Sequence, residues 1–88
     1  MVEKTLTVRN RAGIHARPSA LIVKTAIKFK SEVYLERGND RINAKSIMGL
    51  LTLGAAYGTK LKVIAVGPDG EQAVAAIEQI FDSRFEED

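Results

Sequence analysis

The chain changes from a strand-like to a helix-like pattern within Gly13-Ile14-His15-Ala16-Arg17-Pro18, which holds the only histidine among 88 residues. If His15 forms the N-cap of a helix, the first-turn amides of Ala16 and Arg17 favour an anion beside its ring. The guanidinium of Arg17 adds a permanent charge whose planar donors fit phosphate oxygens. Pro18 is tolerated in a first turn, where its missing N–H has no partner to lose. Because a neutral imidazole is also a nucleophile, the stretch predicts that His15 accepts a phosphoryl group.

The stretch lies between the first two of seven predicted elements. Apolar alternation predicts strands over residues 2–8, 31–37, 41–44 and 60–66, and helical spacing predicts helices over 16–28, 47–53 and 70–83. Gly38-Asn39-Asp40 has the residues of a tight turn, and Asp69 with Gln72 is similar to a capping box. The order predicts a two-layer α+β domain. Periodicity leaves the strand order open, and a ferredoxin-like βαββαβ arrangement is the generic alternative.

The first predicted helix has two different faces. Its core-facing stripe consists of Pro18, Leu21, Ile22, Ala26 and Phe29. The opposite face is basic with small or apolar residues between the charges: Arg17, Ala20, Lys24 and Ile27.

The short helix after residue 46 begins with a favourable N-cap, Ser46. Leu50 and Leu53 fit its core side, whereas Ile47, Met48 and Leu51 fall on another side. The alternative is that all five apolar residues are core. We expect the second group to be partly exposed, and an exposed apolar patch marks a partner site. Together with Arg17, Ala20, Lys24 and Ile27 it would form a docking face with an apolar centre and a basic rim.

Composition excludes several classes of protein. The length suits one domain, residues 1–88, and 45% hydrophobic with 27% charged residues is ordinary for a globular protein. No cysteine is present, so neither a disulfide framework nor a thiolate metal site is expected, and no residues suggest a metal ligand set or a cofactor. No apolar run approaches the roughly 20 residues of a membrane span, and the first residues do not have the pattern of a signal peptide. A cytoplasmic protein without membrane insertion is therefore expected.

The net charge of +2 is unevenly distributed. Residues 1–30 carry seven Lys or Arg against one Glu, whereas residues 69–88 carry seven acids against one Arg. A basic first third suggests an acidic partner. A nucleic-acid binder is an alternative, but the usual recognition motifs are missing, so no direct nucleic-acid contact is expected.

Two segments resemble the HPr family, the histidine-containing phosphocarriers of the bacterial sugar phosphotransferase system. Residues 13–18 are similar to its active-site segment, and Lys45-Ser46-Ile47-Met48-Gly49-Leu50 is similar to its regulatory serine segment, as in the Gram-positive type. The resemblance spans the chain from end to end. It implies an open-faced β-sandwich in the order βαββαβα, with a four-stranded antiparallel sheet covered on one face by three helices.

The resemblance also implies a function. His15 would take a phosphoryl group from phospho-enzyme I, on Nδ1, and pass it to the IIA components of sugar permeases. The chain would then be a relay and not an enzyme, and a small carrier of this kind is expected to be a monomer. An ATP-dependent HPr serine kinase/phosphorylase would modify Ser46, and the modified form would bind a catabolite repressor protein.

Three rival functions remain. One is an HPr-like regulator that keeps the serine but has no active histidine, which the presence of His15 disfavours. Another is a relay for nitrogen-related phosphotransfer. Such relays differ from the HPr pattern around the serine segment, whereas this chain keeps it. The third, from a different class, is an interaction module in which His15 is inert.

Overall fold

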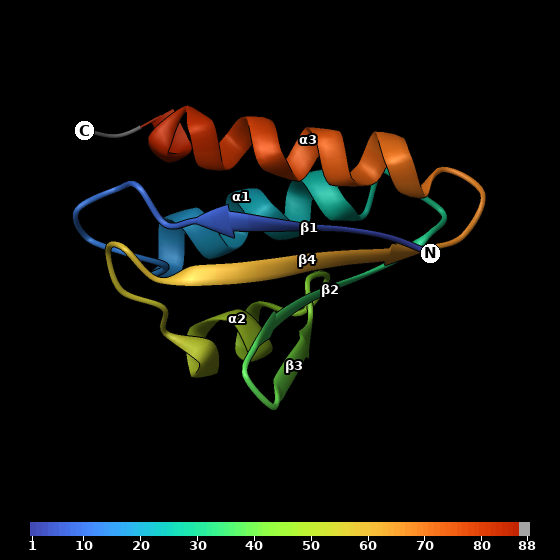
Figure 1. The fold of residues 1–88 in the computed structure, drawn as a ribbon. Coiled ribbons are helices and arrows are strands. Elements are labelled where there is room, and N and C mark those ends of the chain that lie inside the picture. Colours follow the sequence, from blue (N-terminus) through green and yellow to red (C-terminus); the bar gives the residue numbers. More distant parts are fainter. Residues whose placement is uncertain (87–88) are drawn as a thin grey trace.

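The computed structural model describes residues 1–86 of the chain (Figure 1). Four strands and three α-helices follow one another in the predicted order, and a short 3-10 helix, η1, follows them. The elements are β1 (Val2–Thr7), α1 (Ala16–Ala26), β2 (Glu32–Arg37), β3 (Asp40–Asn43), α2 (Ile47–Leu53), β4 (Lys60–Val66), α3 (Gly70–Asp82) and η1 (Arg84–Glu86).

The sheet is antiparallel throughout, and its strand order is β1-β4-β2-β3. The last strand in the sequence therefore lies inside the sheet, with Val63 paired with Lys4 of β1 on one side and with Leu35 of β2 on the other. A ferredoxin-like sheet has its first and third strands in the middle, so this alternative is wrong. The three helices cover one face, which makes the domain the open-faced α+β sandwich that the resemblance implied (Figure 1).

The core lies between the helices and the covered face of the sheet. Alternate residues of β4 point into it, with Leu61, Val63 and Ala65 completely buried. They meet fully buried residues of α1 and α3, such as Ile22 and Ile77. Burial of this apolar surface supplies the main stabilising free energy of a small domain, at about 25 cal/mol per Å².

Ile64 departs from simple alternation. It lies on the other side of β4 from Val63, together with the exposed Lys60 and the partly buried Lys62, yet it is only 2% exposed. Its register partners are Glu3 on β1 and Tyr34 on β2. A residue on an inner strand is flanked by side chains from both neighbours, which explains the burial without a second covering layer.

The predicted capping box at the start of α3 is wrong. Asp69 is the N-cap residue, but its side chain makes no capping hydrogen bond. The carboxylate instead accepts hydrogen bonds from the amide of Lys30 (2.9 Å), the amide of Ser31 (2.9 Å) and the hydroxyl of Ser31 (2.5 Å). Asp69 therefore fastens the start of α3 to the segment that enters β2, a contact 38 residues away in the sequence.

These hydrogen bonds stabilise the charged carboxylate, and they lower the pKa of Asp69 to about 2, the Ser31 side chain contributing most. The unfolded value is about 3.9, so the stabilisation is fully present above pH 4 and is lost as the pH falls through 2. We predict that Asp69→Asn lowers the melting temperature at pH 7. The difference in melting temperature between wild type and this variant should become smaller between about pH 4 and pH 2. Thermal unfolding across this range checks it, with Asp82→Asn on the same helix as control. A difference in melting temperature between wild type and Asp69→Asn that stays the same at every pH would contradict this prediction.

Candidate functional site

The first helix begins as predicted. His15 is the N-cap residue of α1, with extended backbone angles (φ −105°, ψ −160°), and its carbonyl accepts the first helical hydrogen bond, from Ser19 N, at 2.9 Å. His15, Ala16 and Arg17 are all exposed. The amides of Ala16 and Arg17 belong to the first turn, whose N–H groups are directed out of the end of the helix. An anion on the imidazole would therefore meet a positive helix end in an open, solvent-facing place.

The loop before His15 is held from two sides. Within the loop, the side chain of Asn10 donates to Gly13 O at 2.7 Å, and the amide of His15 donates to the same oxygen at 3.1 Å. From outside, Ala55 O accepts a hydrogen bond from Ile14 N at 2.8 Å. Ala55 lies just beyond α2, so the segment that follows the second helix supports the segment that carries His15. No sequence pattern points to Asn10 or Ala55, because the burial of a polar loop residue is visible only in the structure.

Arg17 contacts the end of the described chain. Its Nη1 donates to the carbonyl of Phe85 at 3.1 Å, a separation of 68 residues. Phe85 belongs to η1, whose three residues all have a positive φ between 56° and 59°. The turn is anchored because the Phe85 ring is fully buried and packs on Phe81, with the ring centroids 4.9 Å apart. This contact was missed, and an apolar residue within the acidic end was the one available signal.

The apolar and basic residues of the predicted docking face are exposed. Ala20, Lys24 and Ile27 lie on the solvent side of α1, and on α2 the exposed fractions are 43% for Ile47, 72% for Met48 and 41% for Leu51. Leu50 and Leu53 are buried, so the division of α2 into a core side and an exposed side is confirmed. Lys45 joins the two helices, because its Nζ donates to the carbonyl of Phe29, beyond the end of α1, at 3.0 Å. We call Ala20, Lys24, Ile27, Ile47, Met48 and Leu51 the α1–α2 surface.

Ser46 has the structural role expected of it. It is the N-cap residue of α2, and its Oγ accepts a hydrogen bond from Gly49 N at 3.1 Å. Its side chain is partly exposed and lies directly beside Ile47 and Met48. A charge added at Ser46 would therefore enter the α1–α2 surface.

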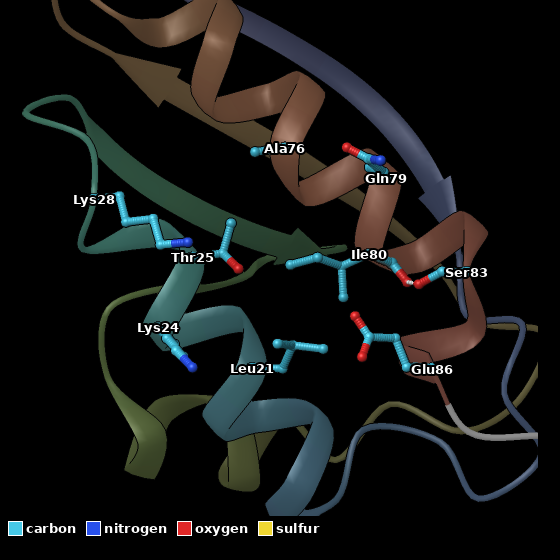
Figure 2. A pocket seen from close by; sticks show the side chains of 9 residues that line it. All are labelled: Leu21, Lys24, Thr25, Lys28, Ala76, Gln79, Ile80, Ser83 and Glu86. Atoms are coloured by element: carbon cyan, nitrogen blue, oxygen red, sulfur yellow. Dashed lines mark hydrogen bonds between the residues drawn. The ribbon is translucent and has the colours of Figure 1, made fainter.

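A groove of about 370 Å³ lies between α1 and the end of α3 (Figure 2). Lys24 comes from α1 and Lys28 from the turn after it. Gln79 belongs to α3, Ser83 follows that helix, and Glu86 belongs to η1. A smaller hollow of about 210 Å³ is lined by Arg17, Ala20, Leu21, Lys24 and Glu86. Both are open, so the surface beside Arg17 offers no enclosed chamber in which a small substrate would be shielded from water.

Within residues 1–86, no group of three or more His, Cys, Asp or Glu side chains is placed to hold a metal ion. Of the helices in that range, none has the length and apolar character needed to cross a membrane.

Comparison with known proteins agrees with the geometry. Residues 2–83 match the family model described as the PTS HPr component phosphorylation site. The chain belongs to the HPr family. It is 50% identical over all 88 residues to the phosphocarrier protein HPr of Treponema pallidum, with both chains covered completely.

Solved HPr-family structures have the same fold. An HPr from Thermoanaerobacter tengcongensis superposes with a TM-score of 0.96 at 44% identity, over 100% of this chain and 99% of that one. Crh of Bacillus subtilis, described as a catabolite repression protein that forms a domain-swapped dimer, superposes with a TM-score of 0.73. It is 40% identical, over 100% of this chain and 98% of the other. The resemblance of the chain to the HPr family is therefore confirmed.

Proposed function

We propose that this chain is a phosphocarrier of the sugar phosphotransferase system, with His15 as the residue that carries the phosphoryl group. One observation supports this most directly: the only histidine of the chain is the exposed N-cap of α1, with Arg17 in the first turn beside it. A histidine kept for packing would be buried, whereas His15 is exposed at a helix end that favours an anion. The presence of His15 also favours a carrier over a regulator that lacks an active histidine.

The transfer step is a direct exchange between two imidazoles. The lone pair of one ring nitrogen of His15 attacks phosphorus, an N–P bond forms, and the N–P bond of the donor breaks with its electrons remaining on the donor nitrogen. No general base is needed, because the attacking nitrogen already has its lone pair. The ring atom proposed from the family resemblance is Nδ1.

Arg17 and the first-turn amides of Ala16 and Arg17 would stabilise the phosphoryl oxygens. To reach them, the guanidinium need only exchange the carbonyl of Phe85 for a charged oxygen, which is a stronger hydrogen-bond partner. The site is open, so the group is held loosely enough to move on. A relay requires this, because tight binding of the phosphorylated state would slow the next transfer.

The partners we propose are enzyme I as donor and the IIA components of sugar permeases as acceptors, both docking on the α1–α2 surface. Its apolar centre and its lysine fit an acidic surface with an apolar patch.

The whole chain, residues 1–88, would act as one HPr-like domain, a cytoplasmic monomer that is a relay rather than an enzyme. No cofactor, metal or direct nucleic-acid contact is part of this proposal. Sedimentation of the purified chain tests the monomer against a swapped dimer of the kind described for Crh.

We propose in addition that an ATP-dependent serine kinase/phosphorylase modifies Ser46. The phosphate would bring about two negative charges beside Ile47 and Met48 and would weaken docking of an acidic donor surface. The modified form would instead bind a catabolite repressor protein. Support comes from the family's serine segment and from the exposed apolar residues next to Ser46.

One labelling experiment with two arms tests both proposals. In the first arm the purified chain is incubated with enzyme I and labelled phosphoenolpyruvate, and in the second with the serine kinase and labelled ATP. We expect an acid-labile, base-stable label in the first arm, as a phosphoramidate gives, and an acid-stable label in the second. A folded chain that takes no label from active enzyme I would rule out the carrier, and a label in the second arm alone would favour a regulator.

A charge placed in the centre of the α1–α2 surface should disrupt docking. We predict that Met48→Asp raises the KM of enzyme I for this chain at least tenfold, or about 1.4 kcal/mol, because a carboxylate replaces an exposed apolar side chain and faces an acidic partner. Val66→Asp is the matched control, since Val66 is an exposed apolar residue outside the α1–α2 surface, at the end of β4. Equal KM values for wild type and Met48→Asp would remove Met48 from the interface.

A further inference from the structure

We propose that Asn10 is a positioning residue for His15, acting through the peptide group of Gly13. This inference rests on the proposed function of His15 as the phosphoryl carrier. Asn10 lies before the helix, five residues from His15, and is completely buried although it is polar. Such a residue needs a structural or functional reason, because burying an amide without hydrogen bonds is unfavourable.

The carboxamide of Asn10 closes a turn around the residue it supports. Its Nδ2 donates to Gly13 O at 2.7 Å, and its backbone carbonyl accepts from Gly13 N at 3.1 Å. Both polar atoms of the Gly13 backbone are therefore bound by one residue. The oxygen that Asn10 holds is the one that accepts the amide of His15, at 3.1 Å.

The backbone at Gly13 also lies close to the segment after α2. Gly13 has a φ of +76°, and a Cβ built on it would lie 2.6 Å from Ala55 O. The next amide, Ile14 N, donates to that Ala55 oxygen at 2.8 Å, and the Ile14 side chain is only 4% exposed. The Gly13–Ile14 peptide is therefore hydrogen-bonded by Asn10 through its oxygen and by Ala55 through its nitrogen.

His15 itself is fixed by its backbone at both ends. Its N–H is bound to Gly13 O and its carbonyl to Ser19 N, so the direction of its Cα–Cβ bond follows from the position of the Gly13 carbonyl. The Cα–Cβ bond sets where the imidazole begins, so the position of the ring depends on this hydrogen-bonded backbone. A displacement of about 1 Å of a reacting group can lower a rate about 100-fold, so a loose Gly13 carbonyl would slow the transfer without removing the imidazole.

The test compares two variants of Asn10 with a control of equal stability. Asn10→Asp keeps the shape but replaces the donor with an acceptor, and Asn10→Ser, which cannot reach Gly13 O, serves if the buried carboxylate prevents folding. Ile77→Val, in the core on α3, is the control for a general loss of stability and is compared with them by melting temperature. Two quantities are measured for each folded variant: single-turnover phosphoryl transfer from phosphorylated enzyme I, and hydrogen exchange of the His15 amide by NMR.

If Asn10 positions His15, the rate of transfer at saturating donor falls about tenfold, with the donor concentration at half-saturation within twofold of wild type. The His15 amide also exchanges at least tenfold faster than in Ile77→Val. Exchange and transfer equal to those of Ile77→Val would overturn the inference. If wild type takes no phosphoryl group, the proposed function fails by itself. The exchange then decides whether Asn10 holds His15, and unchanged protection overturns the inference.

Discussion

Replacing His15 with alanine should reduce acid-labile labelling by enzyme I and phosphoenolpyruvate to background. The chain has no second histidine, so no other imidazole is available to form the phosphoramidate. The fold should be unaffected, because His15 is exposed and makes its helix contact through its backbone carbonyl. The measurement is the labelled fraction after a fixed time, with acid and base treatment of the product.

Ser46→Ala is the matched control for His15→Ala. It removes the other proposed phosphorylation site and leaves His15 in place, so its acid-labile labelling should remain at the wild-type level, whereas labelling by the serine kinase should be lost. Equal melting temperatures of wild type and His15→Ala show that the loss is chemical. An acid-labile label on His15→Ala would contradict the assignment of the carrier residue.

Gly13→Ala should destabilise the domain strongly. The left-handed φ of +76° costs a residue with a Cβ about 1–2 kcal/mol, and the new methyl group would lie 2.6 Å from Ala55 O. Displacing that oxygen also weakens its hydrogen bond from Ile14 N, worth about 1 kcal/mol. A total of about 3 kcal/mol corresponds to a fall of more than 10 °C in melting temperature for a domain of this size.

Gly38→Ala separates the cost of the left-handed backbone from the cost of the close contact with Ala55. Gly38 has a similar φ of +60°, and no atom lies within 4 Å of a Cβ built there. This variant therefore bears the backbone penalty alone, and it should lose about 1–2 kcal/mol. Calorimetry of both variants gives the comparison. Equal losses in Gly13→Ala and Gly38→Ala would mean that the close approach to Ala55 has no energetic consequence.

Local pattern was sufficient to predict the elements. The helix over residues 47–53 and the strand over 60–66 have the predicted bounds, because Ser46 and Gly54 mark the ends of the helix and alternation marks the strand. The strand predicted over residues 2–8 ends one residue early. Val8 still exchanges backbone hydrogen bonds with Gly58 and Thr59, but these residues precede β4 and are part of a loop.

The contacts that complete the candidate site depend on residues distant in the sequence, and pattern does not encode them. His15 and Arg17 could be singled out because the positions around them carry a helix-start signal. The hydrogen bond from Arg17 to Phe85 spans 68 residues, and that of Asp69 to Ser31 spans 38. Asp69 shows the error this causes, since a local rule assigned its carboxylate to its own helix while a distant backbone amide and hydroxyl were available.

The contact between Arg17 and Phe85 has a practical consequence for how the chain is handled. In Figure 1, α3 ends beside the loop that leads into α1, whereas the N-terminus lies at the opposite end of the sheet. An affinity tag fused after residue 88 would be separated by three residues from Phe85, whose carbonyl Arg17 holds. A tag before Met1, which is 82% exposed, would lie far from it. Purification handles and fluorescent labels therefore belong at the amino end, and carboxyl-terminal clipping during storage should be followed by mass spectrometry.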